Sequence, residues 1–437
     1  MTEWNQEFLN FPSFDRRKIE ANFEGGNVSS DGGVILLRQV DRKLALTEAL
    51  DKILPDRRAP EAITHRQIDL LRQRIYGLAL GYEDLNDHAT LRDDLLWQSA
   101  VDRDRPLASS PTLCRLENRI NRRAAWDMHK VLVDQFIASF EKTPEELILD
   151  FDATDDRVHG NQEGRFFHAY YGDWCFLPLY VFCGEKLLVA WLRRSNIDAS
   201  AGTLPVLKRL VARLREAWPK VRIILRGDSG FCRWKTMAWC DANRVDYILG
   251  AARNRRLEIL GKELQAEAKE RWEITGQKQR LFQEFLHKAK TWDRKRRFIH
   301  KAEHTEKGAN PRFVVTSLTG DPQELYDKVY CARGEMENRI KEQQLGLFAD
   351  RTSCQRWWAN QFRLLLSACA YVLLEALRRL GLAASELARA QVGTIRLKLL
   401  KVGTVILRNT RRIRLLFSSA YPYKELFVSV AKRFAPA

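Results

Sequence analysis

Short apolar runs alternate with amphipathic segments between residues 146 and 252. The apolar runs have the length and the β-branched or aromatic content that are typical of strands. They are residues 146–154, 175–183, 186–193, 221–228 and 245–252. Apolar residues at helical spacing fill 203–218, and a second helix-like segment fills 232–244. The order β-β-β-α-β-α-β predicts an α/β fold with a mixed sheet.

Charge is distributed unevenly along the 437 residues, which carry 73 Lys and Arg against 56 Asp and Glu, a net charge of +17. Residues 391–437 hold ten Lys and Arg and one acid, and residues 253–310 hold 16 against nine. This excess indicates a polyanionic partner, with nucleic acid favoured over a membrane surface. The longest apolar stretch has 11 residues, whereas a bilayer helix needs about 20, so we expect no membrane span.

The strand order also suggests a more specific fold. Three strands in hairpin succession, followed by alternating helices and strands, are typical of a ribonuclease H-like mixed-sheet core. We therefore predict such a catalytic core, a β-rich insertion within it and a mainly helical N-terminal region. The predicted regions are a helical DNA-binding region at 1–140, the core at 141–252 and 321–385, a basic β-rich insertion at 253–320, and a basic C-terminal region at 386–437.

Two aspartates stand at the ends of apolar runs. Asp152 lies near the end of the first run, 146–154, and Asp228 ends the run 221–228. A carboxylate at the end of a buried strand can face an open cleft while its backbone stays rigid. Such hard oxygen ligands suit Mg²⁺, and two ions about 4 Å apart can catalyse phosphodiester attack. The alternative is that each Asp merely ends a strand, although two neighbouring carboxylates repel each other unless a cation is present.

A third acid is selected by helix geometry within residues 330–348. Tyr330, Arg333 and Glu337 lie within an arc of roughly 60° on one helix face, and Lys341 continues that face. Glu335 falls on the opposite side. A helix with this pattern can bind a metal through its carboxylate and phosphates through its cations. The alternative is a surface ion pair between Glu337 and Lys341, which contributes only a few tenths of a kcal/mol.

Three blocks of sequence resemble the signature blocks of bacterial insertion-sequence DDE transposases. They are DFDAT at 150–154, LRGDSGF at 225–231 and YCARGEMENR at 330–339. The most similar group has a Tyr-x2-Arg-x3-Glu signature and a β-rich insertion before the last acid, and the resemblance covers roughly residues 145–380. It implies that Asp152, Asp228 and Glu337 bind two Mg²⁺ ions, with Mn²⁺ as a possible substitute, in a ribonuclease H-like core.

The resemblance also implies DNA contacts. Tyr330 and Arg333 match signature residues that contact transposon-end DNA near the cleavage site. Many members place a Lys seven residues after the Glu, where this chain has Gln344. Lys341, one turn earlier, is therefore the expected phosphate contact.

The predicted insertion contains aromatic candidates for a further DNA contact. In the resembling group an aromatic side chain stacks on an unstacked end base, and Trp272 or Trp292 could serve here. The alternative for each tryptophan is packing in the core.

These features predict a transposase that cleaves transposon ends and joins the freed 3′-hydroxyl to target DNA. The resemblance implies a homodimer on two paired ends in a synaptic complex, and a bacterial, nucleoid-associated protein. The N-terminus has no basic start before a long apolar run, so we expect no signal peptide and a cytoplasmic location. Two other hypotheses remain: a metal-dependent DNA nuclease without strand transfer, and a non-catalytic DNA-binding protein that keeps the fold.

Overall fold

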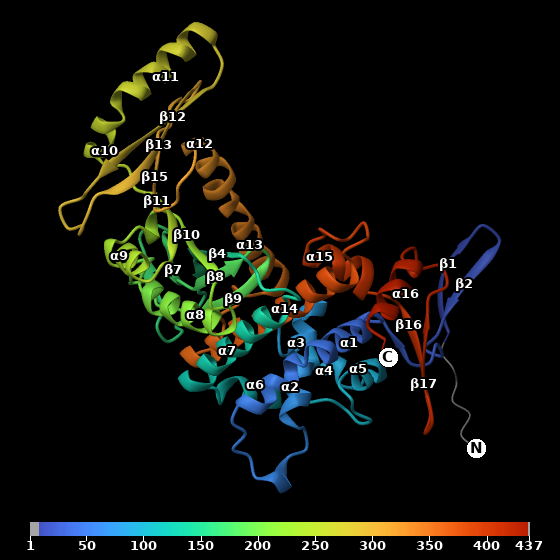
Figure 1. Cartoon of the computed structure of the whole chain (residues 1–437). Helices are drawn as coiled ribbons and strands as arrows, with labels where there is room; N and C mark the ends of the chain where they lie inside the picture. The colour runs from blue at the N-terminus through green and yellow to red at the C-terminus, as the bar shows by residue number, and fades with distance from the viewer. Residues whose placement is uncertain (1–7, 436–437) are drawn as a thin grey trace, which may run out of the picture. The chain divides into compact units, whose positions relative to one another are not determined.

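The computed structural model describes residues 8–435, and Figure 1 shows their helices and strands, labelled where there is room. Two compact units divide the chain. The first contains the described residues up to Thr47, residues 56–114 and the described residues from Ala376 onward. The second contains residues 48–55 and 115–375. No helix within residues 8–435 is long and apolar enough to cross a bilayer.

The first unit combines helices with small sheets. Its helical elements are α1 (Val34–Leu44), η1 (Pro60–Ala62), α3 (Gln67–Leu80), α4 (His88–Leu91), α5 (Leu95–Ala100), η5 (Leu377–Gly381), α15 (Val392–Ile395), η6 (Arg396–Leu400) and α16 (Lys424–Arg433). α2 (Leu46–Ile53) and α6 (Ser110–Asn118) contain residues of both units. The strands β1 (Leu9–Phe14) and β2 (Arg17–Ala21) form an exposed hairpin.

A small sheet and a buried acid connect the two ends of the chain within this unit. β16 (Thr404–Arg408) pairs with both β17 (Ile413–Phe417) and β3 (Val28–Ser29). Asp31, beside β3, is 1% exposed. Its carboxylate accepts hydrogen bonds from the Tyr82 hydroxyl (2.7 Å) and Trp97 Nε1 (2.8 Å), and pairs with Lys401 Nζ (2.7 Å). These partners satisfy a charge that would otherwise be costly to bury.

The second unit is built around a large mixed sheet with the strand order β12-β13-β15-β11-β10-β4-β8-β9. Its strands are β4 (Glu146–Ala153), β8 (Leu179–Cys183), β9 (Lys186–Trp191), β10 (Arg222–Gly227), β11 (Asp246–Ala251), β12 (Gln279–His287), β13 (Arg296–Thr305) and β15 (Arg312–Thr316), with β14 (Gly308–Ala309) paired to β13. β4, β10 and β11 are parallel, and the remaining pairs are antiparallel.

The two faces of this sheet are covered by different helices. Side chains alternate along β4, so Leu147, Leu149 and Phe151 join a core with α7 (Arg122–Ala138), α8 (Thr203–Ala217) and α9 (Trp234–Ala242). The even-numbered residues of β4 lie on the other face. There Ile148 contacts a smaller core that includes residues of η3 (Leu325–Tyr330). Asp150 and Asp152 therefore belong to the face that η3 covers.

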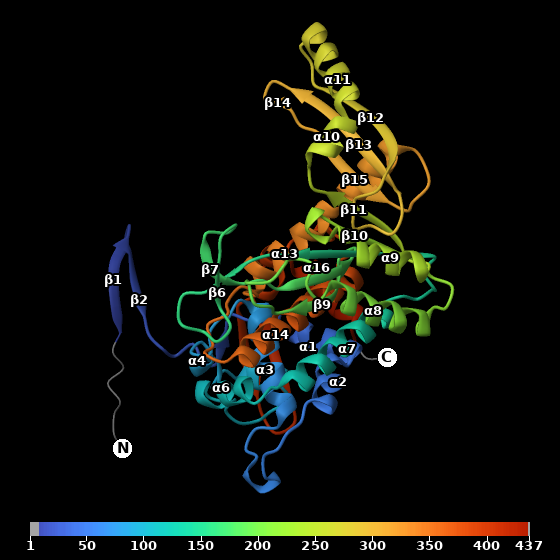
Figure 2. The same ribbon diagram turned by 90° about the vertical axis from the view of Figure 1, so that its left-hand side faces the viewer.

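The chain after η3 continues through the short η4 (Cys331–Arg333) into α13 (Gly334–Leu347), and α14 (Trp357–Ala376) follows. The short α12 (Pro322–Glu324) precedes η3, and η2 (Ser229–Phe231) follows β10. α10 (Arg255–Leu260) and α11 (Lys262–Thr275) come before β12. α11 lies along β12 and β13, as Figure 2 shows.

The predicted α/β class and its mixed sheet are confirmed, and one strand differs from the sequence prediction. Residues 175–183 were expected to form one strand, but the structure has β7 (Asp173–Phe176) and β8 on either side of Pro178. Proline cannot donate a ladder hydrogen bond, which explains the break. β7 pairs with β5 (Asp156–Arg157) and β6 (Phe166–His168) in a separate small sheet.

Candidate active site

Asp152 and Asp228 lie at the carboxyl ends of two adjacent central strands of the large sheet, β4 and β10. β4 and β10 are parallel, with Phe151 opposite Gly227, so Asp152 and Asp228 are the next residues along two adjacent strands. Asp152 is still within β4, where it pairs with Tyr180 of β8, and Asp228 directly follows β10. Backbone amides fix both carboxylates. Asp152 Oδ1 accepts from its neighbour Ala153 N (2.9 Å), and Asp228 Oδ1 accepts from the amide two residues further on (2.8 Å). The structure therefore brings the two predicted acids together on adjacent strands.

Arg333 and Glu337 approach these acids from η4 and α13. Arg333 Nη1 lies 3.4 Å from Asp152 Oδ2, and Arg333 Nη2 lies 2.7 Å from Glu337 Oε1. The sequence predicted one continuous α-helix over 330–348, but the backbone passes from a π-helix in η3 to a 3₁₀ turn in η4 before α13 begins. Such changes of helix type often occur at functional sites. Arg333 and Glu337 keep the i,i+4 relation that joins them.

Tyr330 lies over the end of β11 because Gly250 leaves room for it. A Cβ atom placed on Gly250 would lie 2.6 Å from the Tyr330 hydroxyl oxygen and 2.9 Å from Ser229 N. Both distances are shorter than a carbon can tolerate, so a side chain at residue 250 would displace Tyr330 or the backbone next to Asp228. Sequence reasoning missed Gly250, although a glycine inside a strand pattern often marks such a close approach.

A buried ion pair ties the π-helical segment to the sheet. Arg226 is 6% exposed and Asp150 is 1% exposed. Arg226 Nη2 donates to Asp150 Oδ2 (2.7 Å), and Arg226 Nη1 donates to the carbonyl oxygen of Val329 (2.6 Å). The second bond fixes the residue before Tyr330. Arg226 is therefore a positioning residue, and its bond to Val329 could not be predicted from the sequence.

The electrostatics of the site are dominated by burial and by like charges. Burial raises the pKa of Asp152 to about 7; Arg333 opposes this shift, whereas Asp228 and Glu337 add to it. Burial alone would lower the pKa of Arg333, but the carboxylates of Asp152 and Glu337 outweigh that effect and raise it. Burial also raises the pKa of Tyr330, with Arg333 opposing and Asp228 adding to the shift. The carboxylates of Asp152 and Glu337 thus share the guanidinium of Arg333.

The donor chemistry of the site fits a hard divalent cation. Asp152, Asp228 and Glu337 offer carboxylate oxygens, which are the ligands that Mg²⁺ prefers. Burial is the main cause of the raised pKa of Asp152, and the nearby carboxylates of Asp228 and Glu337 add to it, as expected where like charges share a site. Within residues 8–435, no three His, Cys, Asp or Glu side chains already stand in a metal-binding arrangement. In this conformation Arg333 supplies the positive charge between Asp152 and Glu337.

Replacing Asp152 by asparagine is expected to stabilise the fold at pH 8 without divalent cations. The folded-state pKa of about 7 exceeds the unfolded value of about 3.9. The folded protein therefore retains a proton that the unfolded chain loses, and wild-type stability falls as pH rises between these values. Asparagine avoids this loss. The expected gain grows from pH 4 to 7 and reaches about 2 to 4 kcal/mol.

Urea unfolding of both proteins in EDTA at pH 5 and pH 8 measures this gain. Asp198→Asn is the control, for which we expect the opposite change in folding stability. The pKa of Asp198 is lowered, because the hydrogen bonds from Ser200 and Arg233 outweigh the effect of burial, so its replacement should be mildly destabilising at pH 8. An equal gain for Asp152→Asn at the two pH values would contradict the expectation.

The other sequence candidates occupy different positions. Lys341 is exposed on α13. Gln344 donates to the Asp155 carbonyl oxygen (3.2 Å) and to Asp156 Oδ1 (3.0 Å), which gives it a structural role. Trp292 follows β12 and packs against the core beneath α9 and α10, with its ring stacked on Phe298 at a centroid distance of 5.8 Å.

Trp272 lies on α11, with its ring 4.9 Å from that of His304 between centroids. Its indole nitrogen is buried and has no hydrogen-bond partner among the described residues. Trp272 and Trp292 thus both pack against neighbouring rings. This packing is the alternative that the sequence left open for each, and the predicted base contact of Trp292 stays a prediction.

Comparison with protein families identifies the class. The sequence matches the family described as Transposase DDE domain group 1 over residues 11–437, which places the protein among the DDE transposases. The chain belongs to the family Transposase DDE domain group 1. The cryo-EM structure of a piggyBac transposase synaptic complex with hairpin DNA is similar, with a TM-score of 0.44 and 10% identity over 85% of this chain and 80% of that chain. Curated protein sequences give no significant match.

Proposed function

We propose that this protein cleaves DNA at the ends of its transposable element and joins the freed 3′-hydroxyl to target DNA. The observation that carries the proposal is the convergence of Asp152, Asp228, Arg333 and Glu337 at one edge of the sheet. Membership of a DDE transposase family supports DNA as the substrate. The strand order β9-β8-β4-β10-β11, with β4, β10 and β11 parallel, supports a ribonuclease H-like core.

Asp152, Asp228 and Glu337 are the residues proposed to hold two divalent ions, Mg²⁺ or Mn²⁺. When bound, such ions supply activation of the attacking oxygen and stabilisation of the leaving oxygen. The contribution of the chain is positioning and charge. Backbone amides hold Asp152 and Asp228, while Arg226 fixes the segment before Tyr330.

The DNA contacts in this proposal come mainly from the same segment. Arg333 can exchange its carboxylate partners for a DNA phosphate, because a guanidinium binds either anion through paired donors. Tyr330, whose pKa Asp228 helps to raise, is proposed to contact the end DNA, and the exposed Lys341 on α13 is proposed as a phosphate contact. Trp292 is retained as a proposed base contact. Two protomers are proposed to pair two ends as a homodimer, with target DNA as the second substrate.

The test uses the purified protein, DNA carrying the element's own ends, and a target plasmid. With Mg²⁺ we expect end cleavage and joined products, and with EDTA neither. Asp228→Asn should abolish both reactions while end binding persists, because the carboxylate is lost without a change in side-chain size. Persistent cleavage by that variant would remove Asp228 from the site. Cleaved ends without joined product would establish a nuclease, and binding without wild-type cleavage would establish a non-catalytic DNA-binding protein.

A further inference from the structure

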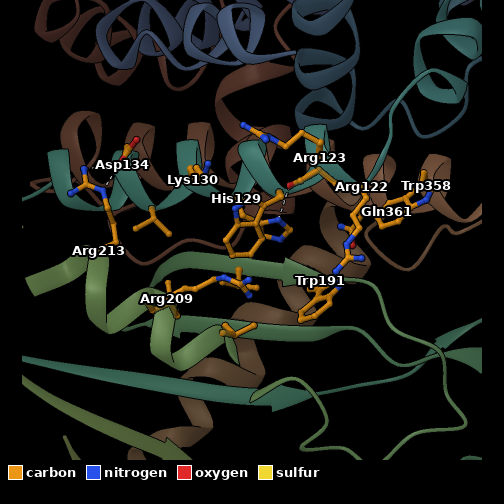
Figure 3. Close-up of a pocket in the computed structure, with 16 residues that line it drawn as sticks. Arg122, Arg123, His129, Lys130, Asp134, Trp191, Arg209, Arg213, Trp358 and Gln361 are labelled. Carbon is orange, nitrogen blue, oxygen red and sulfur yellow. Dashed lines mark hydrogen bonds and ion pairs between the residues drawn. The ribbon is translucent and has the colours of Figure 1, made fainter. Parts of the chain in front are cut away.

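A cavity of about 620 Å³ opens beside β9 in the second unit. It is lined by α7, α8 and the first turns of α14, as Figure 3 shows. We call it the tryptophan–arginine pocket, after the side chains of Trp126, Trp191, Trp358, Arg122 and Arg209 that line it. β9 is the edge strand of the sheet and is two strands away from β4, so the pocket is separate from the candidate active site.

Side chains already occupy backbone hydrogen-bonding groups of the edge strand β9, which forms the floor of the pocket. The carbonyl oxygen of Ala190 on β9 accepts from Gln361 Nε2 (3.0 Å) and lies 3.1 Å from His129 Nε2. Leu192 N donates to Gln361 Oε1 (2.8 Å). These side chains occupy edge groups that an added peptide strand would need. The occupant must therefore bind through its side groups or its rings.

The walls of the pocket present flat and apolar surface. Trp126, Trp191 and Trp358 are half-buried, which leaves part of each ring accessible. The Arg209 guanidinium lies 4.5 Å from the centroid of the Trp126 ring, and in Figure 3 Arg209 extends from α8 toward α7. A guanidinium over an indole is an arrangement on which a further planar ring can stack.

The rim of the pocket carries five Lys and Arg side chains, three of which are in ion pairs. Arg213 pairs with Asp134 (2.8 Å), and Arg123 and Lys130 both pair with Asp127 (2.8 Å each). The other two cations on the rim are Arg122 and Arg209. The apolar walls favour a ring system, and the cations favour a polyanion. Among macromolecules, an unpaired nucleic-acid strand combines both properties, because its bases stack on aromatic side chains while its phosphates meet cations. A duplex has its base faces stacked on one another, so they cannot enter.

We propose that the tryptophan–arginine pocket binds an unpaired stretch of DNA. Bases enter against Trp126 and its neighbours, and flanking phosphates contact Arg122 and Arg209. This inference rests on the proposed function, because that function supplies DNA as the ligand. It adds a second DNA site, away from the acids, that is specific for single strands.

Photochemical crosslinking tests the location directly. A twelve-nucleotide oligo-dT carrying 5-iodouracil is irradiated with the full-length protein in EDTA, and crosslinked peptides are identified by mass spectrometry. We expect crosslinks at Trp126, Trp191 or Trp358, because this chromophore reacts with stacked aromatic rings. Crosslinks confined to other parts of the chain would overturn the proposal.

A matched pair of charge reversals tests the energetics. Arg209→Glu and Lys208→Glu change adjacent exposed residues of α8 by the same charge, but only Arg209 lines the pocket. For Arg209→Glu we expect about tenfold weaker oligo-dT binding and a salt dependence reduced by about 0.7 per lost phosphate contact. Lys208→Glu should stay within twofold of the wild type. Equal effects of the two reversals would overturn the proposal.

Two further measurements separate the rival occupants. If a twelve-base-pair duplex loses as much affinity as oligo-dT in Arg209→Glu, the pocket does not select unpaired strands. If sedimentation shows that Arg209→Glu disrupts a dimer while oligo-dT binding is unchanged, the surface is a protein interface. Either result overturns the inference. Because binding is measured in EDTA, a failure of cleavage would count against the proposed function alone.

Discussion

The Glu337→Gln variant is expected to lose about 1000-fold or more in strand cleavage, which corresponds to several kcal/mol of lost transition-state stabilisation. Its fold should persist. The Glu337 side chain is 44% exposed and its ion pair with Arg333 spans one helical turn, a kind of pair that contributes only a few tenths of a kcal/mol to stability. Single-turnover cleavage of end DNA in Mg²⁺ measures the loss.

The matched control is Glu335→Gln on the same helix. Glu335 precedes Glu337 by two residues, which places it on the opposite side of α13, and it is 64% exposed, 3.9 Å from Arg339. This variant removes the same charge from the same helix and should cleave at the wild-type rate. Equal losses in the two variants would indicate a general effect of charge, and an active Glu337→Gln would exclude this residue from catalysis.

The Arg226→Met variant is expected to lose about 3 to 5 kcal/mol of unfolding free energy, because it leaves the Asp150 carboxylate buried without its partner. Burial already raises the pKa of Asp150, and Arg226 opposes that shift. Arg222→Met on the same strand is the control. Arg222 is 51% exposed and pairs with Glu146 (3.0 Å) and Asp246 (2.9 Å), so its loss should cost about 1 kcal/mol or less.

A double variant separates the stability of this ion pair from its positioning role. Replacing Arg226 by methionine and Asp150 by leucine removes both buried charges, which often restores stability. The double variant still lacks the hydrogen bond to the Val329 carbonyl oxygen. We therefore expect it to cleave DNA more slowly than the wild type, although it unfolds at about the same urea concentration. Identical unfolding midpoints for Arg226→Met and Arg222→Met would contradict the first expectation, and full activity of the double variant would contradict the second.

Local pattern was sufficient to predict most elements of the central sheet. The apolar runs 146–154 and 221–228 form strands β4 and β10, and the helical pattern at 203–218 is α8. These predictions succeeded because strand and helix periodicity are properties of adjacent residues. The prediction of one strand over 175–183 was wrong where Pro178 interrupts the pattern, a signal that the sequence did contain.

Long-range relations could not be read from the sequence. The pairing of β11 with β15, which lies some sixty residues later, depends on tertiary packing. So does the bond from Arg226 to Val329, which are 103 residues apart. Spacing indicated that Arg333 and Glu337 share a face, but not that Arg333 would contact Asp152 across 181 residues. The assignment of the acids as metal ligands stays a prediction that the Asp228 and Glu337 variants test.

The pairing of β11 with β15 bears on attempts to shorten the protein. β11 is hydrogen-bonded to β10 on one side and to β15 on the other, and its Tyr247, Ile248 and Leu249 are buried. Deleting residues 253–320 would therefore bare an apolar strand edge of the kind that drives aggregation. A shortened form of the protein would therefore need a substitute strand in the place of β15.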